Sequence, residues 1–327
     1  MPDPFLATAA PSADGDGAGP SARRRDEAAG ALVLIGGACD PLGDAFGAFL
    51  DLAGARDGGL VVGFTTASGD PAGSARAWAH DFALAGARDV QIPIVDRRQR
   101  AHDEEVAALV RRARGVFLGG GDQVQLVSVL GGSLVGQAIR DAYQRGAVVC
   151  GTSAGAAAIT ETILAYGEPG EAGEHIEMYL GPGLGLLGFH TMIDTHFAAR
   201  RRLHRLFVAI ARNPELMGLG IDEDTALVVR GHLGRVVGAG GVTFVDGRSV
   251  RYDNADAVRR GEEATLTLSY LRVGLVGSGH VLNLRERELE AVVNPPPEDR
   301  AGPTPTVTSA DVEDSSVVRE TGARSAS

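Results

Sequence analysis

The sequence predicts an α/β protein with a mostly parallel central sheet, helices on both faces of that sheet, a nucleophile elbow and an antiparallel C-terminal extension. Between residues 31 and 150, short apolar runs alternate with longer segments of helical period, as is typical of a parallel sheet covered on both faces. From about residue 225 onward, short β segments separated by Gly and Asp turns indicate antiparallel strands. The elbow is expected at the end of the last parallel strand.

Five predicted strands and five predicted helices make up the parallel part. The strands are expected at 31–36, 59–64, 90–95, 115–118 and 147–150, and the helices at about 41–55, 72–86, 102–113, 123–130 and 133–145. Several of these strands end in glycine or threonine residues. Ligands of open α/β sheets bind beyond the carboxyl ends of the strands, so we expect the functional residues to gather at that edge.

After residue 150 the sequence predicts two buried strands, one helix and then the antiparallel segments. Apolar runs at 189–193 and 216–221 indicate the strands, and the helix spans about 198–212. The core stripe of this helix has helical spacing and consists of Leu203, Leu206, Phe207 and Ile210. The antiparallel segments are expected at 226–229, 235–237, 242–245, 265–268 and 281–284.

The globular body is predicted to be a single domain over residues 30–293, because no linker rich in Pro, Ser and Gly interrupts it. Residues 1–29 hold no periodic apolar face, and residues 294–327 combine three consecutive prolines with Ser, Thr, Glu and Asp. Such segments bury too little apolar surface to offset the entropy of ordering them. Both are therefore predicted to be disordered tails.

The charge and composition of the chain restrict its function. The net charge is −11 and all 31 basic residues are arginine. This argues against a nucleic-acid partner and excludes a P-loop lysine, a Schiff-base lysine and a Ser–Lys dyad. The N-terminus lacks the pattern of a secretory signal, and no apolar run is long enough to span a membrane. We expect a cytoplasmic protein that needs no cofactor and does not associate with a membrane.

The turn Gly151-Thr152-Ser153-Ala154-Gly155 follows an apolar strand and precedes a run of three alanines. This strand–turn–helix context is that of a nucleophile elbow, in which small neighbours relieve crowding and the serine hydroxyl is displayed rather than packed. Ser153 is therefore the predicted nucleophile.

A serine nucleophile needs a base and, usually, a group that orients the base. His196 follows a predicted strand at its carboxyl end and is the predicted base. Asp222-Glu223-Asp224 follow the next strand, and either Asp222 or Glu223 could orient the imidazole. The alternative is a metal site built from Asp194, His196, Asp222 and Glu223, but the sequence lacks the dense ligand spacing of known metal motifs, so no metal is predicted.

The run Gly119-Gly120-Gly121-Asp122-Gln123 follows the predicted strand 115–118 and matches no phosphate-binding motif. Glycine-rich backbone at this level of the sheet can aim N–H groups at a developing oxyanion. We predict that the N–H groups of Gly121 and Ala154 form an oxyanion hole, and that Gln123 points a neutral side chain at the substrate.

Four arginines, Arg200, Arg201, Arg202 and Arg205, lie in the N-terminal half of the predicted helix 198–212. The helix dipole favours carboxylates at that end, so a group of cations close to the predicted base indicates binding of an acidic group. The alternative interpretation is a solvated helix face, because the chain uses arginine for every basic residue.

Together these motifs resemble one family, the serine exopeptidases that include cyanophycinases and aspartyl dipeptidases and whose fold is related to class I glutamine amidotransferases. The matching segments lie between about residues 30 and 230. They are Ile35–Ala38, Gly119–Gln123, Gly151–Ala157, Gly181–Leu187, Asp194–Arg205 and Gly218–Ala226.

The resemblance implies a triad of Ser153, His196 and Glu223, with Glu223 rather than Asp222 as the third member. Thr195 stands at a binding position where the family has glutamine, and this departure bears on substrate preference. The residues to which the resemblance assigns substrate binding are Gln123, Asp194, Arg200, Arg202 and Arg205.

The activity that the resemblance implies is hydrolysis of cyanophycin, a polymer with an aspartate backbone and arginine on each side-chain carboxyl, into β-aspartyl-arginine dipeptides by a homodimer. One alternative keeps the triad but acts on aspartyl or isoaspartyl dipeptides, and Thr195 is the feature that favours it. The other alternative is a non-catalytic binding protein on the same fold, against which the intact Ser, His and Glu positions argue.

Overall fold

The computed structural model describes residues 29–166, 178–263 and 265–290, and the structural statements below concern these residues. The predicted tails lie outside the described residues, except for residue 29. The domain limits at 30 and 293 therefore stay a prediction.

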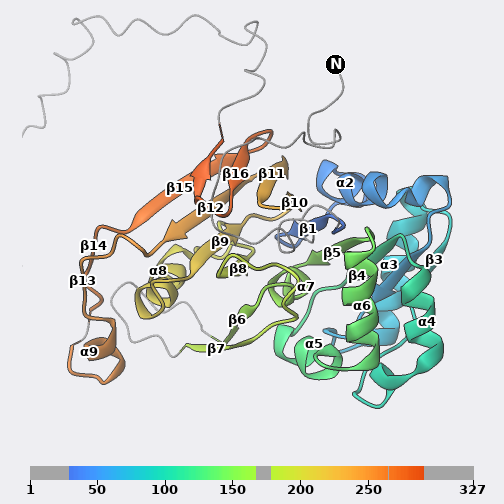
Figure 1. Cartoon of the computed structure of the whole chain (residues 1–327), viewed down its shortest axis with the longest axis horizontal. Coiled ribbons are helices and arrows are strands. Elements are labelled where there is room, and N and C mark those ends of the chain that lie inside the picture. The colour runs from blue at the N-terminus through green and yellow to red at the C-terminus, as the bar shows by residue number, and fades with distance from the viewer. Residues whose placement is uncertain (1–28, 167–177, 264, 291–327) are drawn as a thin grey trace, which may run out of the picture. The chain divides into compact units, whose positions relative to one another are not determined.

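A nine-stranded sheet forms the centre of the fold (Figure 1). The prediction of a parallel sheet with an antiparallel C-terminal extension is confirmed, because one half of this sheet is parallel and the other half, joined to it through the β1–β10 pair, is antiparallel. The parallel strands, in spatial order, are β1 (Leu32–Ile35), β5 (Val148–Thr152), β4 (Gly115–Leu118), β2 (Val61–Phe64) and β3 (Val90–Gln91). The antiparallel strands are β10 (Thr225–Arg230), β11 (Leu233–Gly238), β16 (Val281–Asn283) and β17 (Glu288–Leu289).

Helices cover both faces of the parallel strands. Successive side chains of a strand point to opposite faces, so each strand contributes to two buried clusters. In β1, Leu32 and Leu34 belong to one buried cluster, whereas Val33 and Ile35 belong to another. The first cluster includes residues of α4 (Glu104–Arg112), α5 (Gln123–Leu130) and α6 (Leu134–Gln144). The second includes residues of α2 (Asp44–Ala53) and α3 (Pro71–Leu84).

Side-chain caps fix where four of these helices begin. An Asp or Ser oxygen accepts a hydrogen bond from an N–H of the first helical turn, which satisfies a donor that has no partner within the helix. The capping residues of α3, α4, α5 and α6 are Asp70, Asp103, Asp122 and Ser133.

A second sheet of four strands carries part of the predicted C-terminal extension. Its order is β15 (Arg272–Gly277), β12 (Gly241–Asp246), β9 (Met217–Ile221) and β8 (Thr191–Thr195), and β8 and β9 are parallel. The prediction that 242–245 extends the central sheet is therefore wrong, since this segment lies in β12. The remaining elements are α7 (Ala154–Ala158), β6 (Thr162–Tyr166), β7 (Tyr179–Pro182), α8 (Leu203–Arg212), β13 (Tyr252–Asp253), α9 (Ala255–Arg259), β14 (Leu268–Ser269) and two 3-10 turns, Ala55–Asp57 and Arg100–His102.

Three predicted elements are shorter than expected. The strand expected at 90–95 ends at Gln91, and Pro93, which has no N–H for a strand ladder, follows shortly after. Of the segment expected at 265–268, only Leu268 lies in a strand. The helix expected from residue 198 begins at Leu203, and this residue is 42% exposed instead of belonging to the core stripe.

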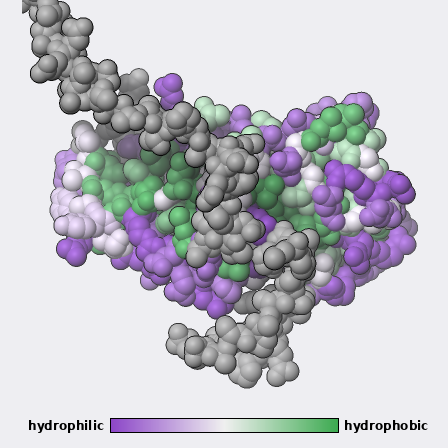
Figure 2. Space-filling model, turned by 90° about the horizontal axis from the view of Figure 1, so that it is seen from above, coloured by the Kyte–Doolittle hydropathy of each residue, from purple (hydrophilic) through white to green (hydrophobic). Residues whose placement is uncertain are grey.

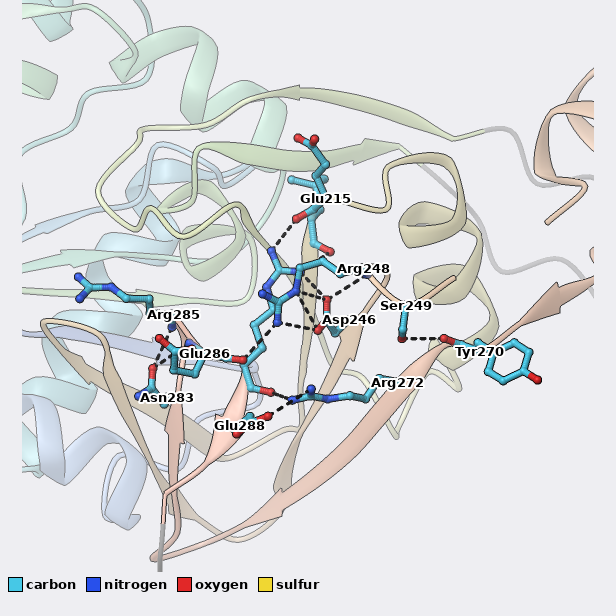
Figure 3. A network of polar contacts seen from close by, with 12 residues as sticks. Glu215, Asp246, Arg248, Ser249, Tyr270, Arg272, Asn283, Arg285, Glu286 and Glu288 are labelled. Atoms are coloured by element: carbon cyan, nitrogen blue, oxygen red, sulfur yellow. Dashed lines mark hydrogen bonds and ion pairs between the residues drawn. The ribbon is translucent and has the colours of Figure 1, made fainter. Parts of the chain in front are cut away.

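A buried ion pair joins the two sheets. Arg287, in the turn between β16 and β17, donates to Asp246 at the end of β12 (2.6 Å) and to the carbonyl of Glu215 before β9 (2.6 Å). Figure 3 shows Arg248 facing Asp246 in the same network. Burial acts to raise the pKa of Asp246, but the hydrogen bonds from Arg248 and Arg287 outweigh it, so the pKa is lowered.

Exposed apolar side chains lie on helices and on short strands, with Leu84 on α3 and Leu203 on α8 among the helical ones. On the edge strand β15, Val273 and Leu275 are exposed, and Tyr270 just before it is exposed as well. Figure 2 shows hydrophobic surface among hydrophilic surface on the face that it views. Among the described residues, no helix has the length and apolar character that crossing a membrane requires.

Candidate active site

Ser153 lies between β5 and α7 in a conformation that is rare for a residue with a side chain (φ 52°, ψ −118°). The glycines on either side are required by close packing. A Cβ on Gly151 would lie 2.4 Å from the carbonyl oxygen of Gly155, and a Cβ on Gly155 would lie 2.1 Å from that of Leu118. The elbow is thus held by backbone contacts that no other residue type allows.

His196 follows β8 directly and faces Ser153. Its Nε2 lies 2.8 Å from the Ser153 hydroxyl oxygen, and its Nδ1 lies 2.7 Å from Oε1 of Glu223. A carboxylate can only accept, so this contact places the proton on Nδ1 and leaves Nε2 free to take the serine proton. The three side chains therefore form one hydrogen-bonded chain in the order that a serine nucleophile requires.

Asp222, the other acid that the sequence left open, points elsewhere. Its carboxylate accepts hydrogen bonds from the backbone N–H groups of Ala198 and Gly241, both at 3.0 Å. It thereby fastens the turn after His196 to the start of β12. Of the two acids, Glu223 is the one that contacts the imidazole.

The residues of the alternative metal site have other partners. Both nitrogens of His196 are engaged by Ser153 and Glu223, and the carboxylate of Asp194 is paired with arginines. Across residues 29–166, 178–263 and 265–290, no group of three or more His, Cys, Asp or Glu residues is placed to hold a metal ion.

The glycine loop after β4 passes beside the serine. A Cβ on Gly120 would lie 3.7 Å from the Ser153 hydroxyl oxygen, and Gly121 has φ +136° with the carbonyl oxygen of Ala67 2.0 Å from where its Cβ would be. Within the described chain, the backbone N–H groups of Gly121 and Ala154 donate to no acceptor. Neither N–H group is therefore engaged by a backbone acceptor of the described residues.

Gln123 begins α5 and reaches across to β6. Its Nε2 donates to the carbonyl oxygen of Leu164 (2.8 Å), so the amide group is held by backbone. The side-chain oxygen is the part of this predicted substrate-binding residue that the contact leaves available.

The predicted arginine group divides into exposed and buried members. Arg200 and Arg201 are exposed and precede α8, whereas Arg205 lies within it and is buried. Arg205 donates to both carboxylate oxygens of Asp194, which is 2% exposed. Arg202 donates to Asp194 (3.0 Å) and to the carbonyl oxygen of Thr195, a buried residue (2.7 Å).

Arg202, which is half-buried, has one guanidinium N–H group without a partner in the described structure. Its Nε is buried and has no acceptor among the described residues. Burial lowers the pKa of Arg202, and the charges of Arg205 and Arg200 act in the same direction, while Asp194 opposes them. An anionic group bound here would relieve this repulsion.

The loop after β1 also reaches His196, which the sequence did not predict. The carbonyl oxygen of Gly36 accepts from the N–H of His196 (2.7 Å), and that of Gly37 accepts from the N–H of Asp224 (2.9 Å). The available signal was the glycine pair at the carboxyl end of a predicted strand, where functional residues were expected. The sequence offers no sign of which residue the pair would contact.

A serine in an elbow, hydrogen-bonded to a histidine that is oriented by a carboxylate, is the arrangement of a serine hydrolase. The model of peptidase family S51 matches residues 66–237, which include all three of these residues. Cyanophycinases of Synechococcus elongatus and Thermosynechococcus vestitus are each 36% identical to this chain over 266 residues, covering 80% of it and 81% of their own length. A cyanophycinase of Nostoc sp. is 34% identical over 269 residues, covering 81% of this chain and 89% of its own.

A solved structure supports the α/β fold described above. The crystal structure of a peptidase from an acI-B1 Actinobacterium superposes with a TM-score of 0.58 at 20% identity, covering 78% of this chain and 97% of its own. The chain belongs to peptidase family S51 and is a serine-type peptidase.

Proposed function

We propose that the chain hydrolyses cyanophycin to β-aspartyl-arginine dipeptides through an acyl-enzyme formed on Ser153. The observation that carries the proposal is the hydrogen-bonded chain from Ser153 through His196 to Glu223, with distances of 2.8 and 2.7 Å. The similarity to cyanophycinases over about four fifths of the sequence supports the choice of substrate.

The proposed reaction begins with attack of the Ser153 oxygen on a backbone amide carbonyl of the polymer, while the hydroxyl proton passes to Nε2 of His196. Glu223 stabilises the imidazolium by accepting from Nδ1, and the N–H groups of Gly121 and Ala154 donate to the oxyanion. Collapse breaks the amide bond, and His196 gives its proton to the leaving amine. Water then releases the acyl group by the same proton route.

Substrate binding is proposed for Arg200 and Arg202, which follow His196 in the turn before α8, where the backbone N–H of Arg200 donates to the carbonyl oxygen of His196. The buried, unsatisfied Nε of Arg202 supports a contact with a substrate carboxylate, because buried polar groups in folded proteins are normally hydrogen-bonded. Asp194 and Arg205 are buried against each other, so we assign them the orientation of Arg202. Gln123 and Thr195 complete the proposed binding set.

A second candidate function keeps the triad and changes the substrate to aspartyl or isoaspartyl dipeptides. Thr195 is the observation that favours it, since a threonine side chain is shorter than the glutamine typical of cyanophycinases. It reaches less far and presents one hydroxyl in place of an amide.

The test is product analysis by mass spectrometry after incubation of the purified chain with cyanophycin and, in parallel, with a panel of isoaspartyl dipeptides. We expect β-aspartyl-arginine dipeptides from the polymer, and no product with Ser153→Ala. Cleavage of the panel with an untouched polymer would establish the second candidate. Failure of a fluorophosphonate to label Ser153, with neither substrate cleaved, would indicate a non-catalytic protein.

The proposal includes a homodimer acting in the cytoplasm, as the resemblance and the composition led us to expect. Light scattering coupled to gel filtration measures the oligomeric state, and fractionation of cells that produce the protein measures its location. A monomeric mass with full activity would remove the dimer from the proposal.

A further inference from the structure

We propose that Gly37 and Asp224 are positioning residues for His196. Gly37 supports the face of the imidazole, and Asp224 locks the loop that carries Gly37. The inference rests on the proposed role of His196 as the base, and neither residue is assigned any contact with the substrate.

The backbone of Gly37 lies against the ring of His196. A Cβ on Gly37 would lie 2.2 Å from Cε1, 2.4 Å from Nε2 and 2.9 Å from Nδ1 of the imidazole. Contact with three ring atoms at once means that the backbone faces the plane of the ring. Gly37 also has φ +100°, which residues with a side chain rarely adopt. Both the close contact with the ring and the backbone conformation therefore require glycine.

This contact restrains a motion that the triad itself leaves free. The hydrogen bonds to Ser153 and Glu223 act in the plane of the imidazole, at the two nitrogens on either side of Cε1. They only weakly oppose displacement of the ring out of this plane by rotation about the Cβ–Cγ bond, and such displacement moves Nε2 out of line with the serine hydroxyl. A backbone surface against the face of the ring blocks this motion on one side.

Asp224 fastens the Gly37 loop to the loop that carries Glu223. The N–H of Asp224 donates to the carbonyl oxygen of Gly37 (2.9 Å), and Oδ1 of Asp224 accepts from the N–H of Asp40 (3.1 Å). The loop after β1 is therefore tied at two points to the residue next to Glu223. The base, its orienting acid and the support under the ring are held as one unit.

Backbone conformation in this unit is unusual at three residues other than glycine. Ala38, His196 and Asp224 have φ of 43°, 51° and 46°, in the left-handed region. Such conformations persist only where the surrounding structure fixes them, and they gather at functional sites. The strain is consistent with a loop assembly selected to place the imidazole rather than for local stability.

The first test is Gly37→Ala, with Gly58→Ala as the matched control. Gly58 has a similar φ of +91°, but nothing lies within 4 Å of its added Cβ, so it reproduces the backbone strain without the ring. We expect Gly37→Ala to lower kcat by about 10²-fold with little change in KM, because displacement of a catalytic group by about 1 Å costs that much. Gly58→Ala should keep the wild-type kcat.

The second test compares Asp224→Asn with Asp224→Ala. Asparagine keeps a side-chain oxygen that accepts from the N–H of Asp40, whereas alanine does not. We expect Asp224→Asn to keep most of the activity and Asp224→Ala to lose at least about tenfold, roughly the effect of one hydrogen bond. The acidic limb of the pH profile of kcat/KM should move in Gly37→Ala and in Asp224→Ala, since both change the surroundings of the imidazole.

Rates of fluorophosphonate labelling of Ser153 separate this inference from the proposed function. Unchanged labelling in His196→Ala would overturn the role of His196 as the base. Loss of labelling in His196→Ala with wild-type labelling in Gly37→Ala would overturn the positioning role alone. Equal losses in Gly37→Ala and Gly58→Ala, or in Asp224→Asn and Asp224→Ala, would also overturn it, since backbone strain or charge would then be the cause.

Discussion

Replacement of Arg205 by lysine tests whether the buried arginine binds Asp194 or the substrate. Arg205 donates to Asp194 through Nε (2.9 Å) and through a second guanidinium nitrogen, and the side chains of the pair are 10% and 2% exposed. Lysine keeps the charge but offers a single ammonium instead of the planar fork. One charge-assisted hydrogen bond is therefore lost, which is worth about 1.5–3 kcal/mol.

We expect Arg205→Lys to lower the free energy of unfolding by about 2 kcal/mol in urea titrations followed by circular dichroism, with an unchanged m-value. Arg201→Lys is the control, because Arg201 is exposed and the described part of the chain shows no ion pair for it. It should stay within about 0.5 kcal/mol of the wild type. Wild-type stability of Arg205→Lys together with a large loss in kcat/KM would refute the assignment and make Arg205 a substrate-binding residue.

Three further predictions concern the triad and the ion pair between the sheets. Ser153→Ala should lower kcat by about 10³-fold or more with an unchanged melting temperature, and more than a tenth of the wild-type rate would remove Ser153 from the mechanism. Glu223→Gln should lower kcat/KM more than Asp222→Asn, and the reverse order would transfer the role to Asp222. The pKa of Asp246 is lowered from its ordinary value of 3.8, so its contribution to stability is present above that value and is lost as the pH falls through the folded-state pKa. Arg287→Met should therefore weaken the fall of the melting temperature on acidification below about pH 4, and an unchanged acid limb would contradict this.

The parallel strands and the elbow were predictable because their determinants are local. An apolar run bounded by glycines specifies a buried strand, and the crowding around Ser153 arises from residues within the same turn and the adjacent strand. The site residues at the ends of β5, β8 and β9 could be placed together because ligands of such sheets bind at the carboxyl ends of the strands.

The elements that the sequence mispredicted depend on contacts between distant segments. The helix expected from residue 198 begins only at Leu203, because the preceding turn is held by the bond from the N–H of Ala198 to Asp222 and by the contacts of Arg202 with Asp194 and Thr195. The alternating pattern of 242–245 suits either sheet. The segment belongs to the second sheet because β9 and β15 pair with it on both sides, and a local sequence pattern cannot show such distant partners.

The acidic run after β9 shows why spacing alone could not assign the orienting acid. Three consecutive carboxylates leave the chain in different directions and meet different partners: the backbone of Ala198 and Gly241, the imidazole of His196, and the backbone of Asp40. The sequence pattern of this run is that of a solvated turn. In the structure, however, the carboxylates of Asp222 and Asp224 hold loops together. Glu223, at 40% exposure, keeps part of its hydration, which reduces the cost of holding a charged carboxylate beside the imidazole. Loop contacts on both sides of a partly hydrated acid let the fold fix the position of the His196 imidazole without burying the carboxylate that contacts it.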